Sequence, residues 1–233
     1  MSENKAGICF DAERAASYDQ RFVKLAAMKD GLHLCMRQAL EDLPQDARIL
    51  CVGAGTGAEI MYLAREFPGW RFTAADPSAA MLEVCRRHAD ENGIAERIDI
   101  RVGYLDALPD LGLFDAATCL LVSHFLTDKV ERRDLFKQIR ARLKPGGTLI
   151  SSDIAGDTQS QTHPQLFNYW LKAMRYAGST DQDIEGYVER FREHVAVLPP
   201  AELGALIASA GFETPVLMYQ ALMMHGFAAK SVK

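Results

Sequence analysis

Several features that would directly indicate a functional class are absent from this sequence. There is no block of Lys or Arg, and 26 basic residues against 31 acidic ones give a net charge of −5. Nucleic-acid binding therefore has little electrostatic support. No apolar run approaches the roughly 18 residues of a membrane span, and residues 1–5 lack the apolar stretch of a secretion signal. We therefore expect a cytoplasmic protein with no membrane partner.

Cysteine is scarce as well. The five cysteines are odd in number, lie far apart and form no C-x-x-C pair. This usage predicts no zinc site and no disulfide framework, but small thiols buried in the core of a reduced protein. A chain of 233 residues, 48% hydrophobic and 24% charged, can bury a core without such cross-links. The cysteines are Cys9, Cys35, Cys51, Cys85 and Cys119.

Internal repeats and low-complexity linkers are also missing, which favours one domain over residues 1–233. Short apolar runs alternate with helical patterns, which predicts a parallel α/β sheet with helices on both faces. Two later β-rich runs have no helix between them and must pair antiparallel, because a parallel crossover needs about a dozen residues. The expected strands are 48–52, 70–75, 98–103, 114–121, 148–154, 213–219 and 221–229, and the expected helices are 12–41, 58–67, 79–92, 130–143 and 201–210.

A glycine-rich turn stands where the first expected strand meets a helix. Gly53, Gly55 and Gly57 permit positive φ and close approach of a ligand to the backbone. Asp76 follows Gly57 by 19 residues, at the end of the second strand, where a carboxylate can accept both hydroxyls of a ribose. Alone, the glycines could form only a tight turn and Asp76 only a helix cap. Together they favour an adenosine-containing cofactor, either a nicotinamide dinucleotide or another.

Three segments resemble a known family. Residues 49–57 (ILCVGAGTG) look like the first motif of the class I S-adenosylmethionine-dependent methyltransferases. Residues 75–82 (ADPSAAML) resemble their second motif, and residues 142–149 (RLKPGGTL) resemble the turn before their fifth strand. The closing hairpin is similar too, so the resemblance covers residues 10–229.

The resemblance implies a fold. It is an α/β, Rossmann-like, doubly wound and mostly parallel seven-stranded sheet with an antiparallel C-terminal hairpin and helices on both faces. N-terminal helices and a helical lid insertion are added to it. The expected regions are an N-terminal helical cap over 1–45, a cofactor-binding core over 46–155, the lid insertion over 156–197, and the last helix with the hairpin over 198–233.

The resemblance also implies S-adenosyl-L-methionine as cofactor, S-adenosylhomocysteine as product, and a role for each matched residue. The glycine turn would line the methionine end of the cofactor and Asp76 would hold its ribose. Tyr104 and Leu105 would lie at the adenine, and Leu120 beside the sulfonium. The full set of expected contacts is Gly53, Ala54, Gly55, Gly57, Asp76, Pro77, Met81, Tyr104, Leu105, Asp106, Leu120 and Leu121, with Tyr18 and Met28 from the N-terminal helix.

Two positions depart from the family pattern. The acidic residue two places before the first glycine is Cys51, and the adenine-side Asp is Tyr104, with Asp106 the nearest acid. Both departures leave open a subunit that binds the cofactor without catalysing a reaction.

Methyl transfer from a sulfonium is an in-line displacement, so the protein mainly aligns the reactants and excludes water. A general base helps only when the acceptor must lose a proton. His124 follows the fourth strand and Asp153 ends the fifth, at the sheet edge where such folds bind ligands. Both are candidate bases; otherwise His124 is a structural histidine, and Asp153 a helix cap or solvated carboxylate.

The insertion is the candidate for acceptor recognition. Residues 163–195 predict two helices broken at 178–180, with an apolar face too wide for one contact surface. Candidate acceptor contacts are Phe167, Trp170, Met174 and Tyr187, unless all of these side chains are core. A second copy of the chain could also meet this face, which would give a homodimer.

We expect an enzyme that methylates a small apolar or aromatic molecule at O, N, S or C. The C-terminal third is also similar to carboxy-S-adenosylmethionine synthases of tRNA modification, which need an arginine in the insertion, and Arg190 and Arg192 stand near that place. An NAD(P)-dependent oxidoreductase is the remaining alternative, although no Tyr-x-x-x-Lys pair occurs.

Overall fold

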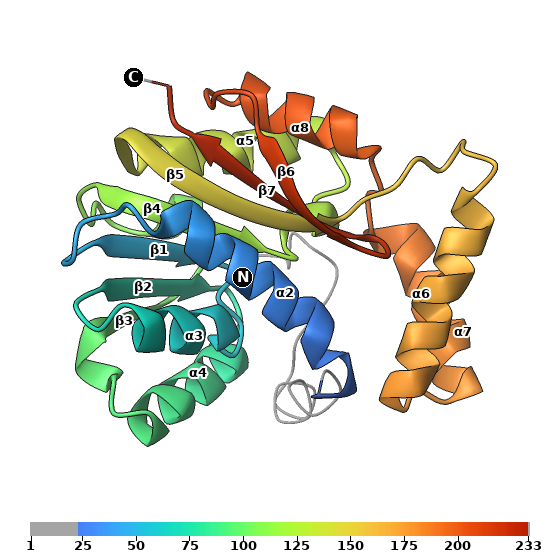
Figure 1. The fold of residues 1–233 in the computed structure, drawn as a ribbon, viewed down its shortest axis with the longest axis horizontal. Coiled ribbons are helices and arrows are strands. Elements are labelled where there is room, and N and C mark those ends of the chain that lie inside the picture. The colour runs from blue at the N-terminus through green and yellow to red at the C-terminus, as the bar shows by residue number, and fades with distance from the viewer. Residues whose placement is uncertain (1–22, 233) are drawn as a thin grey trace.

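The computed structural model describes residues 23–232, and a seven-stranded sheet forms its centre (Figure 1). The strand order is β3-β2-β1-β4-β5-β7-β6. Strands β1 to β5 are parallel, while β7 runs antiparallel between β5 and β6. The expected mostly parallel sheet with an antiparallel C-terminal hairpin is therefore confirmed. The strands are β1 Arg48–Val52, β2 Arg71–Asp76, β3 Ile98–Val102, β4 Phe114–Leu120, β5 Leu143–Ile154, β6 Val216–Ala221 and β7 Met224–Lys230.

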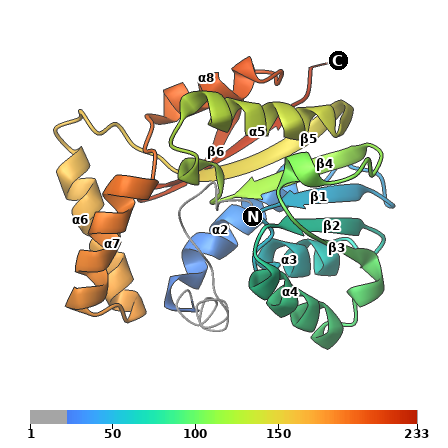
Figure 2. The ribbon, with the colours of Figure 1, turned by 180° about the vertical axis from the view of Figure 1, so that it is seen from behind.

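Helices cover both faces of the sheet, as expected (Figures 1 and 2). Alternate strand side chains point to opposite faces, so Ile49 and Cys51 pack toward α2, α3 and α4, whereas Leu50 and Val52 pack toward α5 and α8. The helices are α2 Ala26–Leu40, α3 Ala58–Glu66, α4 Ala79–Glu91, α5 Lys129–Ala141, α6 His163–Ala177, α7 Asp181–His194 and α8 Pro200–Ser209. Within residues 23–232, none of the helices combines the length and apolarity needed to span a bilayer.

The core uses the cysteines as small apolar side chains. Cys51, Cys85 and Cys119 are completely buried, as the sequence predicts, and Cys35 is half-buried. Cys9 lies outside the described residues. Burial raises the pKa of the Cys51 thiol and raises that of Cys85 to about 12. These thiols therefore stay protonated and neutral.

The insertion forms an upright pair of helices, α6 and α7, beside the carboxyl ends of the strands (Figures 1 and 2). Gly178, at φ +113, ends α6, and Thr180 opens α7 with a capping box, so the predicted break at 178–180 is confirmed. The two connections to the sheet run side by side, since Ala155 pairs with Leu198 and the Gly156 N–H donates to the Leu198 carbonyl at 2.9 Å. The insertion therefore leaves and rejoins the core at one place.

Two of the differences from the predicted boundaries have a clear physical cause. Strand β5 begins at Leu143 rather than at residue 148, because Leu143 pairs with Phe114 across a bulge that absorbs the proline and glycines after it. The hairpin turn lies at Leu222 and Met223, later than expected. Leu222 takes a positive φ of 53° there, a conformation that hairpin turns usually give to glycine or asparagine. Because a leucine stands at this position, the sequence does not mark the turn.

Candidate active site

The glycine turn after β1 is pressed against two neighbouring segments. Gly53 and Gly57 have φ values of +68° and +77°. A Cβ on Gly53 would lie 2.3 Å from a methyl group of Val122, and one on Gly57 would lie 2.5 Å from the Cys85 sulfur. Both positions therefore need glycine for conformation and for space. The turn brings the backbone of β1 next to the residues that follow β4.

Asp76 joins the ends of β1 and β2. Its two carboxylate oxygens accept hydrogen bonds from the Gly55 N–H at 2.9 Å and the Ser78 N–H at 2.8 Å. Ser78, not Asp76, caps α4 by accepting the Met81 N–H. Burial raises the pKa of Asp76, which is 9% exposed, while the two N–H bonds oppose that shift. The helix-cap interpretation is thus wrong, and the carboxylate keeps further acceptor positions at the strand ends.

The other predicted cofactor contacts near the turn and after β3 differ in how deeply they are buried. Met81 is buried, with its terminal methyl 3.3 Å from where a Cβ on Gly55 would stand, and Leu105 is buried. Ala54 is buried too, Tyr104 is half-buried, and Pro77 and Asp106 are exposed. These residues belong to the turn, to the start of α4 and to the segment after β3.

Four predicted contacts lie elsewhere or cannot be placed. Leu120 packs with the α2–α4 side of the sheet, whereas Leu121, at φ +57°, packs with the insertion. The Met28 carbonyl accepts the Tyr219 hydroxyl at 2.6 Å, which ties α2 to β6. Tyr18 lies outside the described residues.

Glu59 is a buried acid that the motif reasoning missed. It is the second residue of α3, directly behind the glycine turn, and is only 7% exposed. Burial raises its pKa to about 7; a hydrogen bond from its own N–H opposes the shift and the charge of Asp76 adds to it. A glutamate in the first turn of a helix is ordinary in a sequence, so only its burial distinguishes this one.

His124 and Asp153 come together at the ends of β4 and β5. Nδ1 of His124 lies 3.0 Å from Oδ1 of Asp153, and the same oxygen accepts the His124 backbone N–H at 2.8 Å. The Ser123 hydroxyl donates to Oδ2 at 2.8 Å. Within residues 23–232, Nε2 of His124 has no hydrogen-bond partner. The carboxylate therefore orients the ring and leaves Nε2 as the free nitrogen.

A buried arginine completes this network. Arg132 is 1% exposed; its Nε donates to the Ser123 hydroxyl at 2.8 Å and its Nη2 lies 3.5 Å from Asp153. Although burial works to raise the pKa of Asp153, Arg132, His124 and Ser123 hold it below its ordinary value. Asp153 is therefore ionised and completely buried, neither a helix cap nor a solvated carboxylate.

The same network reaches the insertion. Nη1 of Arg132 donates to the Ala196 carbonyl at 3.0 Å, and the Ala196 N–H donates to the His124 carbonyl at 2.8 Å. Ala196 belongs to the segment that returns from α7 to the core. The position of His124 is therefore linked to the base of the insertion.

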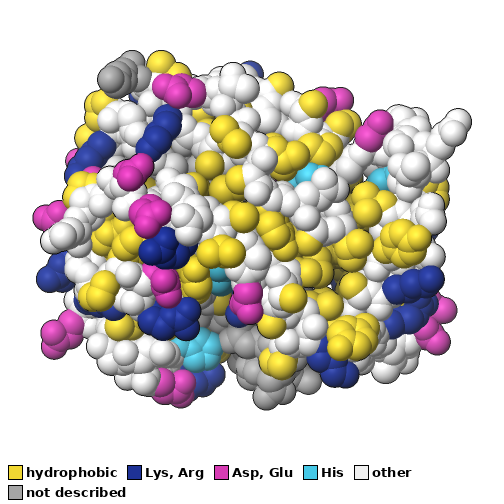
Figure 3. All heavy atoms as spheres, in the orientation of Figure 1, with side chains coloured by type: hydrophobic (Ala, Val, Ile, Leu, Met, Phe, Trp, Pro, Cys, Tyr) yellow, Lys and Arg dark blue, Asp and Glu magenta, His cyan; other side chains and the backbone are white. Residues whose placement is uncertain are grey.

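Most of the predicted acceptor contacts pack together inside the insertion. Phe167, Trp170 and Tyr187 join Leu121 and Ile154 of the sheet edge in one apolar cluster. The Trp170 indole N–H donates to the Tyr187 hydroxyl at 2.8 Å, and burial raises the pKa of Tyr187 to about 12. Figure 3 shows hydrophobic side chains gathered where the hairpin meets the insertion. The cluster thus joins the helix pair to the strand ends.

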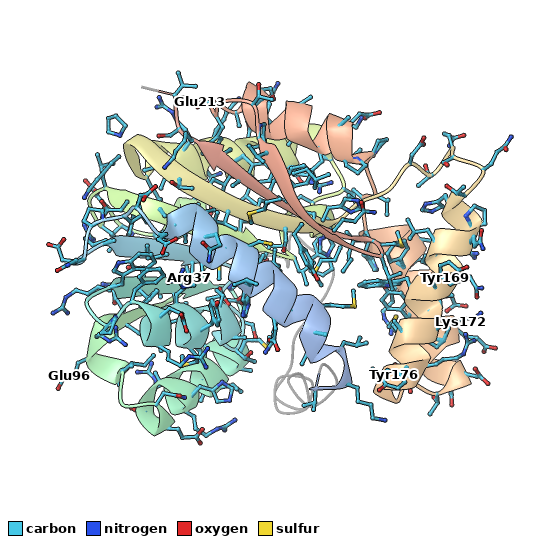
Figure 4. All side chains as sticks on the ribbon, in the orientation of Figure 1. Arg37, Glu96, Tyr169, Lys172, Tyr176 and Glu213 are labelled. Atoms are coloured by element: carbon cyan, nitrogen blue, oxygen red, sulfur yellow. The ribbon has the colours of Figure 1, made fainter. Side chains whose placement is uncertain are left out.

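Other side chains of the insertion face away from this cluster. Figure 4 shows Tyr169 and Lys172 on the outer side of α6, and Tyr176 at the end of α6 nearest the start of α2. There Lys24 stands over the Tyr176 ring, 5.8 Å from its centroid. Met174 is half-buried and lies outside the cluster.

A hollow of about 420 Å³ opens at the base of the insertion. Its lining mixes apolar side chains with one cation, and none of the glycine-turn residues belongs to it. The lining is Thr158, His163, Phe167, Phe191, Arg192, Val195 and Val197.

Comparison with known proteins gives the family. A methyltransferase domain model matches residues 49–147. The ubiquinone biosynthesis O-methyltransferase of Methylocella silvestris is 30% identical over 211 residues, which cover 86% of this chain and 74% of that protein. The chain belongs to the class I S-adenosylmethionine-dependent methyltransferases. The family named by the sequence resemblance is thereby confirmed, and the methyltransferase assignment replaces the nicotinamide alternative.

Other relatives match over smaller parts of their length. This methyltransferase is 27% identical over 150 residues to the ribosomal protein L11 methyltransferase of Symbiobacterium thermophilum, covering 64% of this chain but only 45% of that protein. It is 32% identical over 143 residues to the carboxy-S-adenosyl-L-methionine synthase of Photobacterium profundum, covering 59% and 57% of the two chains.

Solved structures show the same fold. An O-methyltransferase family 2 protein from Planctomyces limnophilus, in complex with apigenin, superposes with a TM-score of 0.63 at 18% identity over 93% of this chain and 62% of that one. CalO1, a methyltransferase of calicheamicin biosynthesis with S-adenosylhomocysteine bound, gives 0.62 at 19% identity over 94% and 58%. The Rossmann-like fold expected from the sequence is confirmed.

Proposed function

We propose that this methyltransferase transfers the methyl group of S-adenosylmethionine to the hydroxyl oxygen of a small aromatic acceptor such as a phenol. The observation that carries the choice of oxygen is the His124–Asp153 pair, with Nδ1 held at 3.0 Å from the carboxylate. A phenol must lose its proton as its oxygen is methylated, and a histidine with one nitrogen fixed by a carboxylate can take it.

The glycine turn and Asp76 fit the cofactor. Gly53 and Gly55 carry no side chains that would keep a ligand from the backbone of the turn, and Asp76 stands at the ends of β1 and β2 with acceptor positions left for two ribose hydroxyls. Leu105 and Tyr104 would then contact the adenine. When bound, the cofactor supplies an activated methyl group on a sulfonium.

His124 and Asp153 have separate roles in the proposed reaction. Asp153 is a positioning residue, because it is completely buried and touches no acceptor; it holds the proton on Nδ1, so that Nε2 is the basic nitrogen. Nε2 takes the hydroxyl proton while the oxygen lone pair forms the new C–O bond. The electron pair of the broken C–S bond would stay on sulfur, which would leave a neutral thioether.

Access to His124 depends on the insertion. His124 is 3% exposed, and Ala196 at the base of the insertion is bonded to its backbone. The proposed reaction therefore requires the insertion to shift and admit the acceptor, in the way mobile segments cover many active sites. Phe167, Trp170, Met174 and Tyr187 would supply the apolar surface for an aromatic ring. The relatives that act in ubiquinone biosynthesis and the neighbour with bound apigenin support an aromatic acceptor.

The test is transfer of a radiolabelled methyl group from S-adenosylmethionine to a panel of phenols, aromatic amines, thiols and enolisable carbon acids. We expect label in a phenol ether, and a loss of about 10² to 10⁴ in rate for His124→Gln. Label in amines or carbon acids alone contradicts O-methylation. Cofactor binding with no transfer to any class favours a binding subunit without catalysis.

A second candidate, carboxy-S-adenosylmethionine synthesis, is favoured by one relative, the synthase of Photobacterium profundum. An extra carboxylate on the cofactor would need an arginine partner. Arg192 lines the hollow at the base of the insertion, and Arg190 is exposed on α7. Mass spectrometry of nucleosides that copurify with the protein distinguishes the two candidates, because a carboxylated cofactor favours the synthase.

A further inference from the structure

The methionine end of the proposed cofactor carries a primary ammonium group, which needs hydrogen-bond acceptors. The described residues around the glycine turn offer few anionic ones. Cys51, at the end of β1, presents a neutral thiol, and the acceptor positions that Asp76 keeps beside its bonds to the Gly55 and Ser78 N–H groups are assigned to the ribose hydroxyls. An ammonium ion entering this region therefore needs another carboxylate.

We infer that Glu59 is that carboxylate and that it binds the ammonium group of the cofactor. The inference rests on the cofactor of the proposed function. Glu59 extends from the first turn of α3, immediately after Gly57, so it lies behind the turn that would receive the methionine end. Glu59 would thus supply the negative charge that the neutral thiol of Cys51 does not.

Within the part of the chain that the structure describes, no counter-charge interacts with Glu59. The titratable groups that interact with Glu59 are Cys51 of β1, Asp76 of β2, Cys85 of α4 and Cys119 of β4. The three cysteines are neutral thiols and Asp76 is an acid, so none of the four is a cation. Within residues 23–232, Glu59 forms no ion pair and its carboxyl group accepts only its own N–H. A buried carboxylate without a cation is costly, so a ligand that brings a positive charge satisfies it.

Burial also gives a measurable consequence. The pKa of Glu59 is raised to about 7, so about half of the carboxyl groups are protonated at pH 7 in the empty protein. An ammonium ion beside the group favours the ionised form. Cofactor binding therefore releases about half a proton at pH 7, and more at pH 6.

The experiment is calorimetric titration of S-adenosylhomocysteine into wild type and Glu59→Gln at pH 7, in phosphate and in Tris, whose different ionisation enthalpies reveal proton release. Glu83→Gln is the matched control, because Glu83 is an exposed glutamate on α4. 5′-Methylthioadenosine, which lacks the amino-acid end, serves as the control ligand.

For wild type and Glu83→Gln we expect the same affinity and the same proton release. Glu59→Gln should bind S-adenosylhomocysteine about 10- to 100-fold more weakly, the range for losing a hydrogen bond to a charged group, and release no proton. Its affinity for 5′-methylthioadenosine should not change.

Three results overturn the inference. They are unchanged S-adenosylhomocysteine affinity in Glu59→Gln, the same proton release in that variant, or an equal loss of affinity for both ligands. Wild-type proton release is measured without any substitution, so a Glu59→Gln variant that failed to fold would still leave that test. Failure of wild type to bind S-adenosylhomocysteine at all contradicts the proposed cofactor instead.

Discussion

Replacing Glu59 with Gln should stabilise the empty protein, although it weakens cofactor binding. The pKa of Glu59 lies at about 7 in the folded chain, roughly 2.5 above its ordinary value of 4.5. Each unit corresponds to about 1.36 kcal/mol, so ionised Glu59 costs the folded state up to roughly 3 kcal/mol. Gln keeps the shape of the side chain and removes that cost.

The sign of the pH dependence follows from linkage. A carboxyl group with a raised folded pKa costs nothing below its unfolded pKa, and folded stability is lost as pH rises from about 4.5 to 7. At pH 5 the cost is still below about 1 kcal/mol, so wild type and Glu59→Gln should unfold within about 3 °C of each other. At pH 8 the variant should unfold about 6–12 °C higher, at roughly 2–4 °C per kcal/mol for a chain of this size.

The assay is thermal unfolding by circular dichroism at pH 5 and pH 8, with and without saturating S-adenosylhomocysteine. Bound ligand should reduce the advantage of the variant at pH 8, because its ammonium group compensates the charge in wild type. Glu83→Gln should be neutral at both pH values. A Glu59→Gln variant that is equally or less stable than wild type at pH 8 would refute the reasoning.

Three further predictions concern the site. Gly53→Ala places a Cβ 2.3 Å from a Val122 methyl at φ +68°, so it should cost about 1–3 kcal/mol in urea unfolding; an unchanged midpoint contradicts this crowding. Asp153→Asn leaves Arg132 buried without its anion and should cost about 3–5 kcal/mol at neutral pH, less as pH falls below about 4; the double change with Arg132→Met should cost less than the sum of the single changes. Tyr187→Phe removes the acceptor for the Trp170 indole and should cost about 0.5–1.5 kcal/mol in urea unfolding, whereas no loss would contradict that bond.

The strand pattern predicted the sheet well because each parallel strand is an apolar run closed by a turn. The run ending at Val52 is buried on both faces, and its alternate side chains serve two helix layers. Boundaries were harder where pairing overrides local signals. Leu143 joins β5 through a bulge opposite Phe114, and Leu222 makes a hairpin turn that no glycine announces.

The site was predictable where a short motif carries its chemistry. The glycine turn and Asp76 are adjacent in the structure because β1 and β2 are neighbours in the sheet. The pairing of His124 with Asp153 joins residues 29 positions apart, and sequence gives the two strand ends but not the hydrogen bond. Arg132 and Glu59 were missed, because their burial depends on packing that no local pattern encodes.

One measurement tests the central claim most directly: calorimetric titration of S-adenosylhomocysteine into wild type and Asp76→Ala. Asp76 would hold the ribose through hydrogen bonds to a charged group, each contributing about 1.5–3 kcal/mol. We expect one ligand to bind per wild-type chain, and at least about tenfold weaker binding by the folded variant. No binding by wild type at millimolar ligand, or equal affinity in the two proteins, would contradict a cofactor site at the ends of β1 and β2.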